Sequence, residues 1–179
     1  MRIAPRWPLF LLALFLPLAG CSNDELAVED AAPPKPTGRV AMLMGGWPHA
    51  KTITETGKAT AYRIERDLET GEEKMLGAGV ALRPGQRTEL IGLLSRDDAY
   101  GWDIAKGCEP MPGVLITFED GATYARLRIC FGCQMLGYTP GGWEDFDPIN
   151  GALIAWVKGV FPNDRLIQKL GTPEDEGGL

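Results

Sequence analysis

One segment in the second half of the chain predicts local structure most clearly, and we expect it to form a β-hairpin. Residues 114–118 and 123–131 flank Asp120-Gly121, a dipeptide that is favoured in two-residue turns because both central residues need positive φ angles. If Asp120 and Gly121 are the two loop residues, Glu119 pairs with Ala122. In the second strand one face carries Ala125, Leu127, Ile129 and Phe131, and the other carries Tyr124, Arg126, Arg128 and Cys130. We therefore expect one face in the core and one wetter face.

The other patterns predict an α+β domain, in which antiparallel β-hairpins form a sheet and helices pack on one face. Alternation predicts a strand over residues 58–65, and a second strand around 80–82 follows a turn at 69–72. Apolar residues at helical spacing predict three helices, over residues 88–94, 149–160 and 164–170. Asp147-Pro148 is expected to begin the second helix, and Gly171 to end the third.

The first twenty residues have the layout of a secretory signal peptide. Arg2 and Arg6 precede an apolar run over residues 9–18, and the small residues Ala19 and Gly20 follow it. This run is much shorter than the roughly 20 residues that a helix needs to span a bilayer. We therefore expect residues 1–20 to be a signal peptide that is removed, and not a permanent transmembrane segment.

The segment Leu18-Ala19-Gly20-Cys21 resembles the lipobox of bacterial prolipoproteins, in which an apolar residue and two small residues precede an obligatory cysteine. The resemblance implies that the Cys21 thiol receives a diacylglycerol, that the chain is cut before Cys21, and that in many bacteria the new amino group is acylated too. Each buried CH₂ contributes about 0.8 kcal/mol, so two or three acyl chains give stable attachment to a lipid bilayer. The alternative is an ordinary signal peptide with a chance cysteine.

The lipobox resemblance also bears on location. Residues 22–24 are Ser-Asn-Asp, without Asp directly after the cysteine. In envelopes with two membranes, this pattern resembles lipoproteins of the outer membrane, on its periplasmic face, more than those kept at the inner membrane.

Composition divides the mature chain into a tether, one domain and a tail. Residues 21–38 carry the lipidated cysteine and a Pro-rich acidic segment without apolar periodicity, which predicts a disordered tether. A single domain is expected over residues 39–171, and an acidic disordered tail over 172–179. Arg2 and Arg6 are the only charges before Cys21, so removal of the signal peptide changes the formal net charge from −6 to −8. This balance argues against nucleic acid as a partner, because phosphate binding needs clustered Lys and Arg.

Three cysteines remain if Cys21 is lipidated: Cys108, Cys130 and Cys133. An exported protein meets an oxidising compartment, so we expect one disulfide and one remaining thiol. Continuing the hairpin register residue by residue places Cys133 opposite Cys108, although Pro110 and Pro112 must disturb the ladder. The sequence therefore favours Cys108–Cys133, with Cys108–Cys130 as the second choice.

Other chemistries have weaker support in the sequence. Cys130 and Cys133 have the spacing of a redox CxxC motif, but Gly137 and Pro140 leave no room for the helix that follows such a motif in thioredoxin-like proteins. A zinc site would need His49, the only histidine, which is expected to lie in a loop. Paired acids such as Glu144-Asp145 are expected to be solvated, and Arg126 and Arg128 either bind an anion or pair with acids on neighbouring strands.

The mature domain also resembles a group of small exported bacterial proteins of uncharacterised activity, over about residues 59–170. The likeness consists of a cysteine before Pro-Gly-Val, a hairpin, and a Cys-Phe-x-Cys arrangement, here at Cys130–Cys133. A basic residue or His often follows the first cysteine's proline in that group, where this chain has Met111. We expect a membrane-anchored envelope lipoprotein with a non-catalytic binding or structural role, no cofactor, and an envelope protein as partner. The alternative is a thiol-redox or metal-handling protein that uses Cys108, Cys130 and Cys133.

Overall fold

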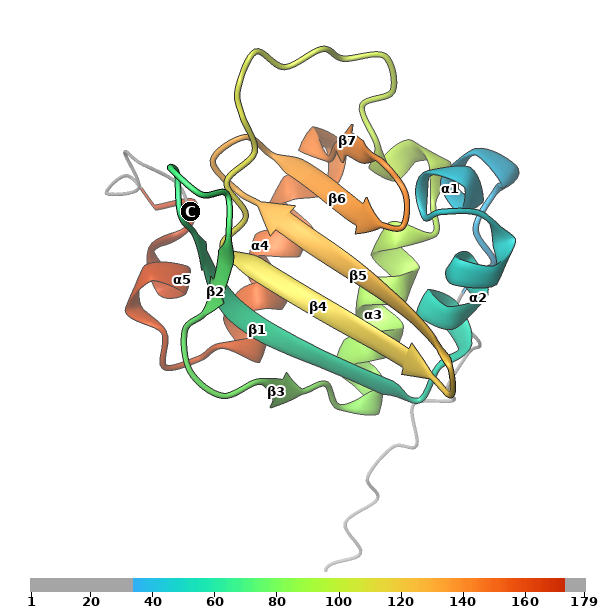
Figure 1. Ribbon diagram of the computed structural model, residues 1–179. Helices are drawn as coiled ribbons and strands as arrows, with labels where there is room; N and C mark the ends of the chain where they lie inside the picture. Colours follow the sequence, from blue (N-terminus) through green and yellow to red (C-terminus); the bar gives the residue numbers. More distant parts are fainter. Residues whose placement is uncertain (1–33, 173–179) are drawn as a thin grey trace, which may run out of the picture. The chain divides into compact units, whose positions relative to one another are not determined.

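The computed structural model describes residues 34–172, so the predicted signal peptide, Cys21, most of the tether and most of the acidic tail lie outside the described residues. The described chain folds as an antiparallel sheet with helices on one side (Figure 1), which confirms the predicted α+β class. No helix among residues 34–172 is both long enough and apolar enough to cross a membrane.

The sheet of the described chain has seven strands, ordered β2-β1-β4-β5-β6-β7, with β3 also paired to β1. All pairs are antiparallel. The strands are β1 (Lys58–Arg66), β2 (Glu73–Met75), β3 (Val80–Ala81), β4 (Val114–Asp120), β5 (Thr123–Cys130), β6 (Met135–Thr139) and β7 (Trp143–Asp145). Strands β6 and β7 were not predicted, because glycines and a proline interrupt the apolar pattern of this segment.

The central hairpin is present, but its predicted register is wrong. Asp120 pairs with Thr123, so Gly121 and Ala122 form the loop, one position later than expected. Gly121 has φ 59°, and a glycine with positive φ at the first loop position is typical of a type II′ turn. The predicted division of faces is confirmed for Ala125, Leu127 and Ile129, which are buried.

The helices are α1 (Gly38–Leu43), α2 (Trp47–Glu55), α3 (Pro84–Leu94), α4 (Asn150–Val160) and α5 (Arg165–Lys169), with short 3₁₀ turns η1 (Asp97–Ala99) and η2 (Asp147–Ile149). Helices α1 and α2 were not predicted, and Pro36 before them is buried. His49, expected in a loop, lies in the first turn of α2. Helix α3 begins earlier than expected because Pro84 occupies its first turn. Asp147 starts η2 and does not cap α4.

One hydrophobic core fills the space between the sheet and the helices. Its largest fully buried side chains include Phe118, Leu127 and Phe146, and residues from α1 to α5 belong to the same cluster. Two tyrosines buried in this core form a hydrogen bond to each other. The Tyr138 hydroxyl donates to the Tyr100 hydroxyl, 2.7 Å away, and Tyr100 donates to the carbonyl of Leu94, 2.8 Å away. Burial raises the pKa of both phenols above the ordinary value.

Candidate functional site

The three cysteines of the described residues meet where a long connection crosses the end of β5. Residues 101–113, between η1 and β4, contain no helix or strand, and Figure 1 shows this segment as the loop that projects above the sheet. The turn after β5 brings Cys130 and Cys133 next to it. We call residues 101–113 the stapled loop, because a disulfide ties the loop to this turn.

The disulfide joins Cys108 of the stapled loop to Cys133, with the two Cα atoms 6.1 Å apart. This separation lies within the usual range for disulfides. The pair is the one that the sequence favours, but the register from which it was inferred does not hold. The β4–β5 ladder pairs Val114 with Ile129 at this end, so both bonded cysteines lie outside the strands. The stapled loop, and not strand pairing, brings Cys108 to Cys133.

Cys130 is a free thiol, buried with 1% of its surface exposed. Its Sγ accepts hydrogen bonds from the amides of Met111, at 3.2 Å, and Cys133, at 3.4 Å. The sequence placed Cys130 on the wetter face of β5. That expectation is wrong, because the stapled loop crosses the end of the strand there and shields the sulfur.

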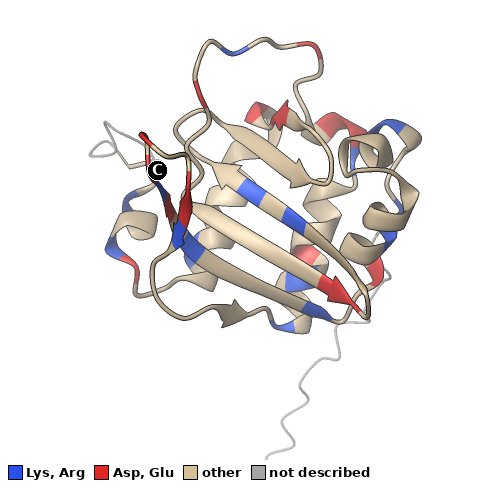
Figure 2. Cartoon of the chain, in the orientation of Figure 1, with Lys and Arg blue, Asp and Glu red and all other residues tan. Residues whose placement is uncertain are grey.

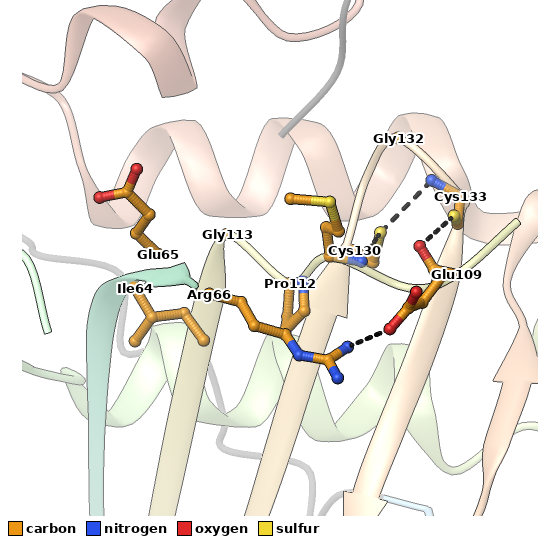
Figure 3. A pocket seen from close by; sticks show the side chains of 10 residues that line it. Ile64, Glu65, Arg66, Glu109, Pro112, Gly113, Cys130, Gly132 and Cys133 are labelled. Atoms are coloured by element: carbon orange, nitrogen blue, oxygen red, sulfur yellow. Dashed lines mark hydrogen bonds and ion pairs between the residues drawn. The ribbon is translucent and has the colours of Figure 1, made fainter. Parts of the chain in front are cut away.

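A pocket of about 410 Å³ is lined in part by Cys133, one of the two bonded cysteines, and Figure 3 shows the side chains that line it. Its lining comes from the end of β1, the stapled loop and the turn after β5: Ile64, Glu65, Arg66, Glu109, Met111, Pro112, Gly113, Cys130, Gly132 and Cys133. The Arg66 guanidinium bonds the Glu109 carboxylate at 3.2 Å and the carbonyl of Pro110 at 3.1 Å. Arg66 therefore ties the second half of the stapled loop to β1, next to the pocket.

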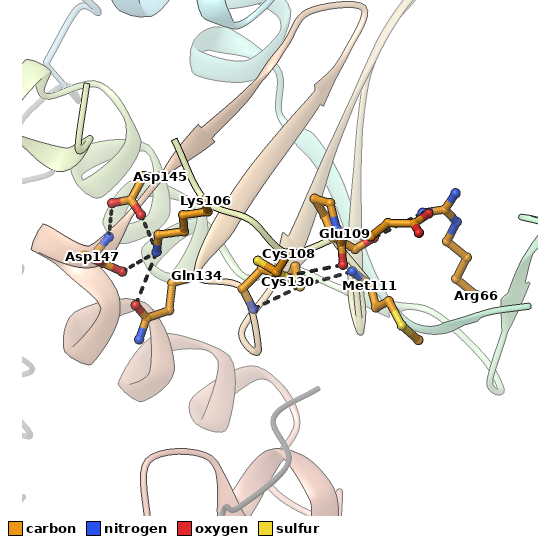
Figure 4. Close-up of a disulfide and its surroundings, with 11 residues drawn as sticks. Arg66, Lys106, Cys108, Glu109, Met111, Cys130, Gln134, Asp145 and Asp147 are labelled. Carbon is orange, nitrogen blue, oxygen red and sulfur yellow. Dashed lines mark hydrogen bonds and ion pairs between the residues drawn. A yellow bond between two sulfur atoms is a disulfide. The ribbon is translucent and has the colours of Figure 1, made fainter. Parts of the chain in front are cut away.

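A cluster of charges holds the first half of the stapled loop (Figure 4). The Lys106 ammonium contacts the carboxylates of Asp145 and Asp147 and the side-chain carbonyl of Gln134. Burial opposes the charge on Lys106, but hydrogen bonds to Asp145 and Asp147 outweigh it and hold the pKa of Lys106 above its ordinary value. Asp145 was expected to be solvated. It is instead fully buried, and the Lys106 charge compensates it.

A further contact ties the start of the stapled loop to α1. The Arg39 guanidinium lies over the Trp102 ring, 4.0 Å from its centroid, and contacts the Asp103 carboxylate at 3.4 Å. Together with Lys106, the disulfide and Arg66, this contact holds the loop at intervals along its length. Lys106, Arg39 and Arg66 were not singled out from the sequence, because each acts through a residue far away in the chain.

The arrangement of Cys108, Cys130 and Cys133 differs from that of a thioredoxin-like redox site and from that of a metal site. The Cys130–Cys133 motif lies at a strand end and in a turn, and the next element is the strand β6, so the motif does not begin a helix as it does in thioredoxin-like proteins. Within residues 34–172, no group of three or more His, Cys, Asp or Glu side chains is arranged to hold a metal ion. His49 lies in α2 with its Nδ1 atom 3.0 Å from the carbonyl of Gly45.

The two arginines of β5 differ in their surroundings. Arg128 forms an ion pair with Glu73 of β2 and donates to the Thr139 hydroxyl at 2.6 Å. It has an acidic partner, but this acid does not lie on a neighbouring strand as expected, because β1 and β4 separate β2 from β5 in the sheet. Arg126 is exposed, lies 5.5 Å from the Tyr124 ring centroid, and has no ion pair among the described residues. Figure 2 shows the basic positions on β5 and the acidic positions near β2.

Comparison of the chain with protein-family models, with curated proteins and with solved structures found no match.

Proposed function

We propose that this chain is a lipid-anchored protein of the bacterial cell envelope, and that its domain binds an envelope protein through the stapled loop. The lipobox at Leu18–Cys21 supports the anchor. The chain then reaches the domain through the Pro-rich tether. A binding role needs no reacting group, and what supports it is the way the stapled loop is held.

The proposal rests mainly on the stapled loop. This loop is long and has no regular structure, yet contacts along its length hold it in place. Connections of this length are uncommon in compact domains and usually have a function. Binding residues concentrate on loops that a rigid scaffold holds in place. A disulfide and several ion pairs reduce the entropy that the loop would lose on meeting a partner.

The stapled loop also presents apolar side chains to solvent. Ile104 is 51% exposed and Met111 is 40% exposed, on either side of Cys108. Apolar side chains that become buried on association supply much of the free energy of protein binding. The proposed partner is therefore a protein with an apolar surface, and not a polyanion.

The anchor is tested by replacing Cys21 with serine. Wild-type protein should fractionate with membranes and carry the mass of attached lipid, whereas Cys21→Ser should lose both. If Cys21→Ser is still cut at the same bond and stays with the envelope pellet, the anchor is wrong.

The binding role is tested by crosslinking the lipidated protein in envelope membranes of the bacterium that makes it. Ile104→Asp should lose a crosslinked partner that wild type retains. Leu68→Asp is the matched control, because Leu68 is an exposed leucine in the β1–β2 turn. Equal capture by both variants, or no protein partner for wild type, would contradict binding through the stapled loop.

A further inference from the structure

Three sulfurs gather at one point, two in a disulfide and one as a thiol. Cys130 precedes Cys133 by three positions, and its Sγ lies 3.4 Å from the amide nitrogen of Cys133. Its second hydrogen bond, from the Met111 amide, comes from the stapled loop that also carries Cys108. Figure 4 shows Cys130 beside the disulfide. The free thiol is thus packed against both segments that the disulfide joins.

The three cysteines differ in exposure. Cys108 is exposed, Cys133 is half-buried and Cys130 is buried. The pocket beside them is lined by Cys130 and Cys133. Exposed disulfides are more often the labile or regulatory ones, and exchange requires a thiolate close to a disulfide sulfur. Here Cys108 of the disulfide is exposed, and the Cys130 sulfur lies against the backbone of Cys133.

We propose that Cys130 exchanges with the Cys108–Cys133 disulfide. The Cys130 thiol loses its proton to water, and its sulfur forms a bond to Sγ of Cys133. The bond between Cys133 and Cys108 breaks, and Cys108 leaves as a thiolate that can take up a proton. One disulfide and one thiol are present before and after the step, so it needs no oxidant or reductant.

The exchange moves the free thiol from a buried position to an exposed one. The new disulfide, Cys130–Cys133, lies within the turn after β5, so the covalent tie to the stapled loop is gone. Cys108 then lies on a loop that is held by Lys106 and by the Arg66–Glu109 pair. Its thiolate can attack an external disulfide, which forms a mixed disulfide at Cys108 and releases the other half as a thiol. Cys108 is thereby a site for covalent attachment of thiols, an activity that does not depend on the proposed binding role.

The lipidated protein, which begins at Cys21 and is purified in detergent without reductant, provides the test. It is incubated with oxidised glutathione at mildly alkaline pH and quenched with acid, and its cysteines are mapped by mass spectrometry. Wild type should carry glutathione at Cys108 together with a Cys130–Cys133 disulfide. Cys130→Ala should keep Cys108–Cys133 and take up no glutathione. Glutathione at Cys108 of Cys130→Ala, or none on wild type, would overturn the proposal.

A second variant keeps the test decisive if Cys130→Ala does not fold. Cys108→Ser leaves only Cys130 and Cys133 in the domain, and the proposal expects them to form a disulfide under air, with neither thiol open to alkylation in denaturant. Two alkylatable thiols in folded Cys108→Ser would show that these sulfurs cannot bond to each other. Near-UV circular dichroism establishes that each variant is folded.

Discussion

At the scale of single residues, the ion pair between Arg63 and Asp164 joins β1 to the start of α5. Arg63 is buried on the core side of β1, and its Nε lies 2.9 Å from Oδ2 of Asp164. Asp164 also caps α5, because its Oδ1 accepts from the amides of Leu166 and Ile167, each at 3.0 Å. Burial opposes ionisation of Asp164, but the amide of Ile167 and the Arg63 guanidinium outweigh it and lower the pKa of Asp164.

Asp164→Asn should remove the negative charge but keep the N-cap of α5, since Asn and Asp cap helices about equally well. At neutral pH we expect a loss of roughly 1–2 kcal/mol in the free energy of unfolding, because Arg63 is left buried without its counter-charge. A lowered folded-state pKa means that the Asp164 contribution is complete above the unfolded-state value of 3.8 and disappears as the pH falls through the folded-state value. Urea unfolding of both proteins should therefore give curves that differ at pH 7 and converge in acid. A difference that stays constant with pH would contradict this account.

At the scale of elements, the end of α1 packs directly against the turn between β6 and β7. The amide of Gly142 donates to the carbonyl of Leu43 at 3.1 Å. A Cβ atom at Gly141, where φ is 146°, would lie 2.3 Å from that same carbonyl oxygen. Because the obstacle is backbone, a side chain at Gly141 can fit only if the helices move away from the sheet.

Gly141→Ala should therefore lower stability by about 2–3 kcal/mol, through backbone strain and loss of this contact. Gly92→Ala is the matched control, because Gly92 lies inside α3 and a Cβ there meets no atom within 4 Å. The control should gain up to about 1 kcal/mol from the higher helix propensity of alanine. Thermal unfolding of both variants measures the contrast, and equal effects would show that close approach at Gly141 does not hold α1 and α2 in place.

At the scale of the whole molecule, the disulfide joins two cysteines 25 positions apart and closes a segment that includes β4 and β5. The Cys108→Ser/Cys133→Ser double variant should lose about 3 kcal/mol, because the unfolded chain is no longer constrained. Wild type in dithiothreitol should approach the same midpoint. Hydrogen exchange should quicken in the stapled loop and stay slow in β4 and β5, whose strand pairing is untouched. Equal exchange in the loop with and without the disulfide would contradict its role in holding the loop.

The sequence by itself determined those features whose cause is local. The central hairpin, the short helix predicted over residues 164–170 and the apolar stripe of α4 follow from periodicity and from preferences that act over a few residues. These patterns were enough for the α+β class. The lipobox at Cys21 is local too, and it stays a prediction because it lies outside the described residues.

Only the tertiary structure decided which distant residues meet. Three features depend on segments that are far apart in the chain. They are the burial of Cys130, the ion pair of Lys106 with Asp145 and the ion pair of Arg128 with Glu73. The hairpin register also depended on the fold, since the local turn signal placed Asp120 in the loop, whereas Asp120 pairs with Thr123 at the end of the strand. The physical reason is that periodicity tells which face of an element is buried, whereas its neighbours are selected by packing and charge compensation over the whole core.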